Sequence, residues 1–110
     1  MNDCIFCKII AKEVPSSIVA ETGDVLVIKD RAPKAPIHYL IMPKKHIKDI
    51  QSFERTDCCY GSKMIMMAQH LSKTVQDAEE FRLVVNSGHK AGQRVFHVHM
   101  HFLAGMEMAE

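Results

Sequence analysis

The sequence feature that most restricts the fold is a run of alternating residue types, HVHMHF, at positions 97–102. Successive side chains on a β-strand point to opposite faces of the sheet. The alternation therefore predicts a strand over residues 96–103, with imidazoles on one face and apolar side chains in the core on the other. Because histidine is a poor core residue, the imidazole face indicates a functional cleft or a solvent-facing surface.

Apolar periodicity in the remaining sequence predicts a single α+β domain over residues 1–110. A short helix is expected at 4–11 and a long helix at 56–78, where apolar residues recur at helical spacing. Further strands are expected at 18–21, 25–29, 38–42 and 81–85. Most gaps between strands are too short for crossover helices, so we expect a sheet of about five antiparallel strands with helices on one face.

Charge balance and cysteine content narrow the expected partners and compartment. Lys and Arg total 14 and Asp and Glu total 13, so no surplus of positive charge exists to bind nucleic acid or an anionic membrane. No stretch approaches the ~20 apolar residues of a membrane helix. The start of the chain does not match a secretory signal, and the four cysteines do not form a convincing disulfide framework. We therefore expect a cytoplasmic protein without nucleic-acid or membrane partners.

The histidine run allows three chemical interpretations. Packing alone explains it poorly, because three imidazoles in register are hard to assign to a core. Metal binding is an alternative, since a His-x-His pair can present two nitrogens to one ion, although few carboxylates lie nearby in the sequence. Nucleophilic catalysis is the third: one imidazole attacks, its neighbours donate hydrogen bonds, and a pKa of about 6.5 gives both protonation states at neutral pH.

A second motif, Cys4-Ile5-Phe6-Cys7, has the two-residue gap of a thiolate metal pair. Two buried thiols without a metal are the alternative, because cysteine is among the most buried residue types. A thioredoxin-like redox centre is not favoured, since no βαβ pattern surrounds the pair. The motif makes Cys4 and Cys7 candidate metal ligands.

Three segments together resemble the histidine triad (HIT) superfamily. They are the histidine run with the apolar residues that follow it, the polar segment Asn86-Ser87-Gly88 with Gly92-Gln93, and the stretch APIHYLIMPKKH at 35–46. The last two are similar to the Hint branch, and the likeness extends from about residue 3 to residue 106. The resemblance implies the HIT fold and a homodimer in which two sheets join edge to edge as one ten-stranded sheet.

The resemblance also implies an activity, the hydrolysis of nucleoside 5'-phosphoramidates or related AMP derivatives through a covalent nucleotidyl-histidine. His99 would be the nucleophile, and His101 would hydrogen-bond the phosphoryl group. His38, on a neighbouring strand, would support the triad. The backbone of His97 would brace His99.

A purine nucleotide pocket follows from the same resemblance. Asp30 matches the acid that binds the ribose hydroxyls. An apolar slot for the base would consist of Phe6, Ile9 and Ile28, although ordinary core packing explains these three equally well. The loop on the phosphate side would use Asn86, Gly92 and Gln93.

Arg94 departs from the resemblance. It stands where better-known members of the branch carry a small hydroxyl residue that contacts the leaving group. A guanidinium cannot accept a hydrogen bond but suits anionic oxygens, so we expect a shift toward phosphate-bearing leaving groups.

Some bacterial proteins with this pattern bind zinc, and the resemblance adds His46 and His97 to Cys4 and Cys7. Such a Cys2His2 set would be closed and structural, and no catalytic metal is expected. Three alternatives stay open at this point. They are a nucleotide-binding or zinc-dependent interaction module with incidental hydrolysis, a diadenosine polyphosphate hydrolase, and a metal-dependent hydrolase with the histidine run as ligands.

Overall fold

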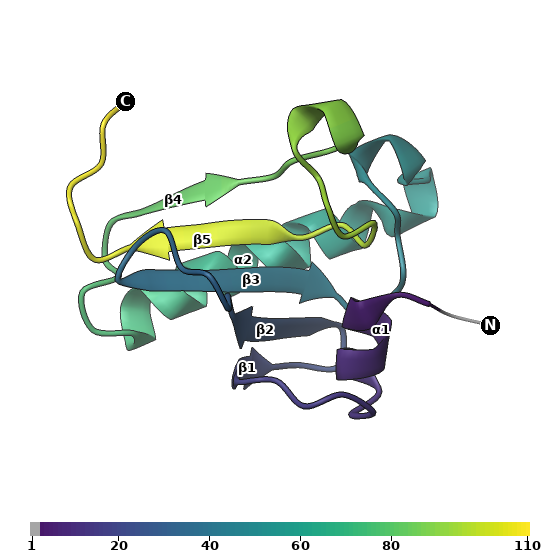
Figure 1. The fold of residues 1–110 in the computed structure, drawn as a ribbon, viewed down its shortest axis with the longest axis horizontal. Coiled ribbons are helices and arrows are strands. Elements are labelled where there is room, and N and C mark those ends of the chain that lie inside the picture. Colours follow the sequence, from purple (N-terminus) through teal and green to yellow (C-terminus); the bar gives the residue numbers. More distant parts are fainter. Residues whose placement is uncertain (1–2) are drawn as a thin grey trace.

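A single antiparallel sheet of five strands forms the centre of the computed structural model, which describes residues 3–110 (Figure 1). The first two residues of the predicted domain lie outside this range. The strand order is β1-β2-β3-β5-β4. The strands are β1 Ile18–Glu21, β2 Val25–Lys29, β3 Ile37–Pro43, β4 Phe81–Val84 and β5 Met100–Ala104. The helices are α1 Ile5–Ile10 and α2 Cys58–Thr74, with short 3-10 turns at Ile50–Ser52, Arg55–Asp57 and His89–Ala91. The predicted α+β class and five-stranded antiparallel sheet are confirmed.

The two helices cover opposite faces of the sheet (Figure 1). α2 packs over the face that carries Val25 and Val27, and α1 packs over the face that carries Leu26 and Ile28. These four consecutive residues of β2 are all buried. The expectation of helices on one face is therefore wrong, because a strand that is apolar on both sides needs cover on both sides.

α2 is held to the sheet by one apolar stripe. Met64, Met67 and Leu71 on that stripe are buried in the larger core cluster. The helix ends at Thr74, earlier than predicted, because Val75 is already extended, with a ψ of 126°. In residues 3–110, neither this helix nor any other has the length and apolar character of a membrane span.

The last strand begins later than the sequence pattern predicts. β5 starts at Met100 rather than at residue 96. Before it, the N–H of Val98 donates to the Ile47 carbonyl at 2.7 Å, which ties this segment to the loop after β3. The first two histidines of the run therefore lie in an irregular segment, and the third lies in a strand.

Candidate active site and metal centre

His99 is buried beneath α1, and one of its ring nitrogens is tied to the backbone. Its Nδ1 lies 2.8 Å from the His97 carbonyl oxygen. A carbonyl oxygen can only accept a hydrogen bond, so Nδ1 carries the proton and Nε2 of the neutral ring keeps its lone pair. The ring of Phe6 packs edge-on against this imidazole, with the ring centroids 5.1 Å apart. These contacts fix the tautomer that a nucleophilic imidazole requires.

A second pair of imidazoles joins β3 to β5. His38 Nε2 lies 2.9 Å from His101 Nδ1, and the backbone N–H of Lys34 donates to His38 Nδ1 at 3.0 Å. His38 therefore carries its proton on Nε2 and donates it to His101, which in turn carries its own proton on Nε2. A carboxylate oxygen of Asp30 lies 3.4 Å from His38 Nε2. The Nε2–H of His101 is thus available as a hydrogen-bond donor. The centroid of this ring lies 5.1 Å from the centroid of the His99 ring.

Burial lowers the pKa of the four histidines around His99 and His101, which are His38, His97, His99 and His101. The pKa of His97 and the pKa of His101 fall to about 4, mainly because burial disfavours the charged ring, and neighbouring imidazoles add to the effect. Burial also lowers the pKa of His38 and of His99, although the Asp30 carboxylate opposes the shift in both. All four rings are therefore neutral at pH 7, in agreement with the tautomers set by the hydrogen bonds.

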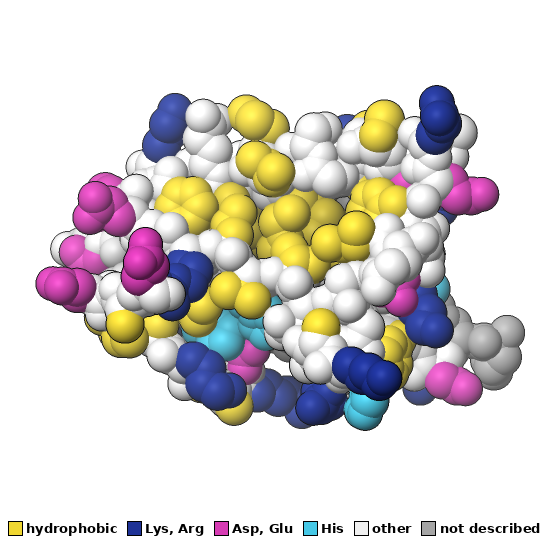
Figure 2. Space-filling model, turned by 90° about the horizontal axis from the view of Figure 1, so that it is seen from above, with side chains coloured by type: hydrophobic (Ala, Val, Ile, Leu, Met, Phe, Trp, Pro, Cys, Tyr) yellow, Lys and Arg dark blue, Asp and Glu magenta, His cyan; other side chains and the backbone are white. Residues whose placement is uncertain are grey.

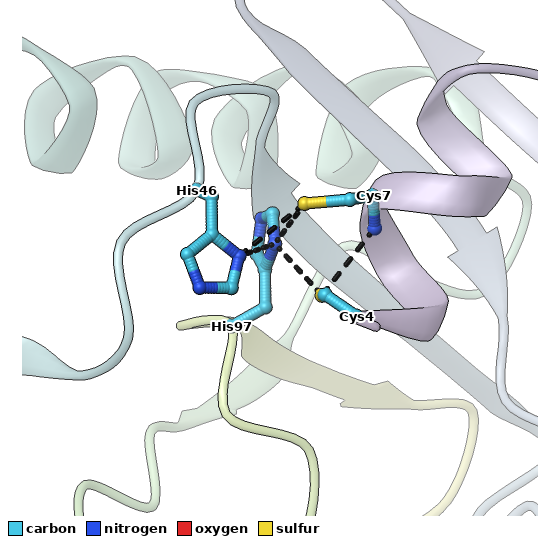
Figure 3. Close-up of side chains that lie close together, drawn as sticks. All are labelled: Cys4, Cys7, His46 and His97. Atoms are coloured by element: carbon cyan, nitrogen blue, oxygen red, sulfur yellow. Dashed lines mark hydrogen bonds between the residues drawn. The ribbon is translucent and has the colours of Figure 1, made fainter. Parts of the chain in front are cut away.

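Four side chains from three segments of the chain converge at the start of α1 (Figure 3). They are Cys4, Cys7, His46 and His97, whose ligand atoms all lie within 4.8 Å of one another. His97 Nδ1 lies 3.4 Å and 3.5 Å from the two sulfur atoms and 3.2 Å from His46 Nδ1. Cys7 Sγ lies 3.3 Å from His46 Nδ1. The four residues thus form a cluster that could hold a metal ion, and we call it the Cys2His2 cluster.

The geometry of the Cys2His2 cluster fits a tetrahedral ion. Zn–N bonds of about 2.1 Å and Zn–S bonds of about 2.3 Å place ligand atoms roughly 3.4–3.8 Å apart in a tetrahedron. The four separations between these ligand atoms, 3.2–3.5 Å, are close to this range. His97 Nε2 donates to the Pro43 carbonyl at 2.7 Å, so the lone pair of Nδ1 faces the cluster. A ligating histidine that donates its other N–H to a carbonyl is the usual arrangement at metal sites.

The residues expected to hold the ribose and the base lie on the α1 side of the sheet. Asp30 follows β2 and stands beside His38, as its 3.4 Å contact shows. Phe6, Ile9 and Ile28 belong to one buried cluster between α1 and the sheet, and each is at most 6% exposed. Because they are so little exposed, these three residues belong to the core. Only the exposed edge of their cluster could contact a nucleotide base.

Gln93 is buried and ties the loop after β4 to other segments. Its Oε1 accepts from the Gly88 N–H at 2.8 Å, and its Nε2 donates to the carbonyls of Lys48 and Val95 at 2.8 and 3.0 Å. Both protons of the amide are therefore engaged. The Gln93 side chain therefore lies beneath the loop and stabilises it. The resemblance implies instead that this side chain faces the ligand.

The other three loop residues lie nearer the surface. Gly92 has a φ of 101°, a conformation that favours glycine, and a Cβ there would lie 3.8 Å from the Asn86 side chain. Arg94 is exposed and donates to the His89 carbonyl at 3.2 Å. The loop thus brings Asn86 and Gly92 together and leaves the guanidinium of Arg94 accessible.

Sequence reasoning did not find two of the backbone groups that set the tautomers. These are the N–H of Lys34 and the carbonyl of Pro43. The His97 carbonyl lies where the resemblance to the family places a backbone brace for His99. Every residue carries such groups, so no side-chain pattern marks them. Proline 43 gives the one weak signal, because it ends its strand and has a carbonyl but no N–H to offer.

Known proteins resemble this chain over nearly its whole length. The family described as HIT domain matches residues 11–108. An uncharacterized HIT-like protein of Synechocystis is 38% identical over 104 residues, which cover 94% of this chain and 91% of the relative. Protein HitA of Neisseria gonorrhoeae is 36% identical over 103 residues, which cover 94% of this chain and 96% of that protein.

Solved structures show the same fold along the whole chain. A HIT family hydrolase from Clostridium thermocellum matches with a TM-score of 0.95 and 39% identity, over 100% of this chain and 96% of the other. A HIT family hydrolase from Legionella pneumophila matches with a TM-score of 0.92 and 36% identity, over 97% of this chain and 96% of the other. The family match, the relatives and the shared fold together show that this chain belongs to the HIT domain family.

Proposed function

We propose that this chain is a nucleotide hydrolase or nucleotidyl transferase that cleaves purine nucleoside 5'-phosphoramidates or related adenylates through a covalent bond between phosphorus and His99. The observation that carries the proposal is the 2.8 Å contact between His99 Nδ1 and the His97 carbonyl. It leaves Nε2 as an unprotonated nitrogen, which is what attack on phosphorus requires. The two similar solved structures that are named hydrolases support the reaction class.

The proposed reaction has two displacements at phosphorus. Nε2 of His99 attacks, and the bond from phosphorus to the leaving amine breaks as the amine takes up a proton from solvent. The His97 carbonyl, which accepts from Nδ1–H, stabilises the positive ring that results. Water then attacks phosphorus and gives one proton to solvent, the bond to His99 breaks, and the nucleoside monophosphate leaves.

His101 acts on the phosphoryl oxygens in this reaction, and His38 positions it. The Nε2–H of His101 donates a hydrogen bond where negative charge grows in the transition state. His38 holds that tautomer through its 2.9 Å hydrogen bond. A backbone N–H holds His38 in turn, so the donor is fixed before substrate arrives.

The nucleotide occupies the α1 side of the sheet in this proposal. The Asp30 carboxylate accepts hydrogen bonds from the ribose hydroxyls. Asn86 and Gly92 bind on the phosphate side, and Gln93 keeps their loop in place. The base rests on the outer edge of the apolar cluster that contains Phe6, Ile9 and Ile28.

The Cys2His2 cluster would hold zinc as a structural ion. With four protein ligands the site is closed, so the ion would supply cross-linking of three chain segments rather than a reacting group. His97 would contribute Nδ1 to that site while its carbonyl orients His99.

A metal-dependent hydrolase, whose ion would be held by His101 of the histidine run together with Asp30 and His38, fits this hydrogen bonding less well. Asp30, His38 and His101 have ligand atoms within 4.8 Å of one another. However, Nδ1 of His38 accepts from a backbone N–H, so its Nε2 carries a proton and has no lone pair for an ion. A metal there would have to displace the contact between His38 and His101.

A homodimer is part of the proposal, and the β4 edge of the sheet supports it. β4 pairs with β5 on one side, and Figure 2 shows hydrophobic side chains gathered across the face above that edge. An apolar depression of about 190 Å³ lies there, lined by Ile50, Phe53, Gly61, Met64, Val85, Val98 and Met100. Pairing with a second copy would cover this surface and close the edge.

Intact-mass analysis during turnover tests the proposed function. We expect protein mixed with an adenosine 5'-phosphoramidate to gain the mass of one adenylyl group, and His99→Ala to gain none. His70→Ala is the matched control, because His70 is exposed on α2 and should leave the adduct unchanged. Turnover by the His99→Ala variant at the wild-type rate would overturn the proposal, and would favour a binding module or direct attack by water.

A further inference from the structure

Cys4 and Cys7 are placed so that they can form a bond with each other. Cys4 caps α1, and its sulfur accepts a hydrogen bond from the N–H of Cys7 at 3.4 Å. The two sulfur atoms belong to the Cys2His2 cluster, so they lie within 4.8 Å of each other. A disulfide needs an S–S distance of about 2.0 Å, which rotation of the two side chains and a small movement of this helix turn would provide.

The cluster is open to small molecules from one side. A hollow of about 440 Å³ is lined by two of the four cluster residues, Cys4 and His46, together with residues at the start of the chain and before β5. His46 is exposed. An oxidant of a few atoms can therefore reach the sulfur atoms, whereas the cysteines would be inert in a sealed core.

Two contacts connect the cluster to His99. His97 faces the cluster with Nδ1 and orients His99 with its carbonyl, so one residue belongs to both sites. Phe6 lies between the two cysteines in the sequence and packs edge-on against both imidazoles, with centroids 5.9 Å from His97 and 5.1 Å from His99. A change at the cysteines is therefore transmitted to His99 through a side chain and through a backbone carbonyl.

We propose that Cys4 and Cys7 are a reversible thiol–disulfide switch that controls the orientation of His99 through His97 and Phe6. The inference rests on the proposed function of His99. It differs from thioredoxin-like catalysis, because the cysteine pair exchanges no electrons with the nucleotide substrate. The oxidised state is the inactive one.

The oxidant in this switch is a hydroperoxide, and the step balances as follows for hydrogen peroxide. One thiolate attacks a peroxide oxygen, the O–O bond breaks, and a sulfenic acid and hydroxide form. The second thiolate attacks that sulfur, the S–S bond forms, and a second hydroxide leaves. The two sulfurs lose two electrons in total, and the two hydroxides take up two protons and become water.

Oxidation removes two of the four ligands from the cluster. Both sulfurs turn toward each other and away from His46 and His97, so any ion held there is released. The helix turn that carries Phe6 shifts with them. Because loss of an orienting partner costs roughly 10–100-fold in activity, we expect adenylylation of His99 to slow at least about tenfold.

The test uses zinc-loaded protein that carries Cys58→Ser and Cys59→Ser, so that Cys4 and Cys7 are its remaining thiols. Those two replaced cysteines are exposed at the start of α2, which packs on the sheet face opposite α1. Hydrogen peroxide is added, and three quantities are followed. They are zinc release with a chelating dye, loss of two hydrogens by mass with the Cys4–Cys7 link mapped in peptides, and the rate of adduct formation on His99.

A fourth readout does not depend on activity. The Nδ1–H of His99, held by the His97 carbonyl, gives a ring N–H resonance that we expect to shift or broaden on oxidation. Dithiothreitol with zinc should restore the resonance and the adduct rate. A Cys4→Ser, Cys7→Ser variant should be insensitive to peroxide, and the restoration experiment does not require this variant to fold.

Two results would overturn the switch. One is a disulfide with zinc release that leaves both the His99 resonance and the adduct rate unchanged. The other is oxidation that yields sulfinic acids without linking Cys4 to Cys7. If the reduced protein forms no adduct, the proposed function fails, while the His99 resonance still tests the switch separately.

Discussion

At the scale of single residues, main-chain groups decide the chemistry of the histidines. A backbone N–H holds the tautomer of His38, and backbone carbonyls hold those of His97 and His99. In each of these three rings, one nitrogen is hydrogen-bonded to the backbone, and the other nitrogen can contact a side chain, a metal ion or a substrate. The free nitrogens face His101, the Cys2His2 cluster and the proposed position of phosphorus.

Arg94 should influence the choice of leaving group. Its exposed guanidinium can bind anionic oxygens, which a phosphoramidate leaving group lacks and a diadenosine polyphosphate carries. Replacement by serine should lower kcat/KM for the polyphosphate relative to the phosphoramidate by about tenfold, the worth of one charge-assisted hydrogen bond. Steady-state kinetics on both substrates measure the ratio, and an unchanged ratio would remove this role for Arg94.

His101 should make stability depend on pH. Its pKa is about 4 in the folded protein, whereas the pKa of an unfolded histidine is about 6.5. Between these two pH values the unfolded chain therefore binds more protons than the folded chain. This contribution is complete above pH 6.5 and is lost as pH falls toward 4. The free energy of unfolding of His101→Asn, measured by urea denaturation across this range, should therefore fall less steeply than that of the unmodified chain.

Comparing His101→Asn with the unmodified chain also cancels any pH effect of the metal centre, because the Cys2His2 cluster is the same in both proteins. Equal slopes would show that His101 takes up its proton as readily in the folded chain as in the unfolded chain.

At the scale of elements, the spacing of apolar residues predicted the helices and strands. It did not predict the features that depend on contacts with distant parts of the chain. The apolar stripe of α2 and the five strands could be found because their side chains follow one regular spacing. The start of β5 could not, because Val98 is diverted by a carbonyl on a distant loop. The imidazoles and the cysteine pair were likewise visible as residue types, whereas the Lys34 N–H and the Pro43 carbonyl, which set the tautomers of His38 and His97, are backbone groups without a signature.

Gln93 should determine the stability of the loop between β4 and β5. Replacement by alanine leaves the Gly88 N–H and the carbonyls of Lys48 and Val95 without their buried partner. We expect a loss of about 2–3 kcal/mol in the free energy of unfolding. Urea denaturation measures it, with Gln76→Ala as control, since that exposed glutamine should change stability by less than about 0.5 kcal/mol. An equal effect of both variants would contradict the bracing role.

At the scale of the whole molecule, three segments meet where α1, the loop after β3 and the segment before β5 come together (Figure 3). A bound ion would add cross-links to a domain of 110 residues whose α1 has six residues. The same meeting point lies directly next to His99 through Phe6 and His97. Changes in the Cys2His2 cluster should therefore alter both the free energy of unfolding of the domain and the reactivity of His99.

Removal of the two cysteines should remove the metal. Purified Cys4→Ser, Cys7→Ser protein should lack the one equivalent of zinc expected in the unmodified chain. At zinc concentrations about 100 times the Kd, the lost stabilisation is about 2.7 kcal/mol. Metal analysis and thermal melting measure both effects, with Cys58→Ser, Cys59→Ser as control. Unchanged zinc content in the first variant would refute the assignment of the site.

The central claim is that His99 forms a covalent bond with phosphorus, and the stereochemical course of the reaction tests it most directly. Each in-line displacement inverts the configuration at phosphorus. An adenosine phosphorothioamidate of known configuration, hydrolysed in isotopically labelled water, should therefore give a product with net retention, because two displacements occur. Net inversion would mean that water attacks the substrate in a single step, and would contradict a covalent intermediate on His99.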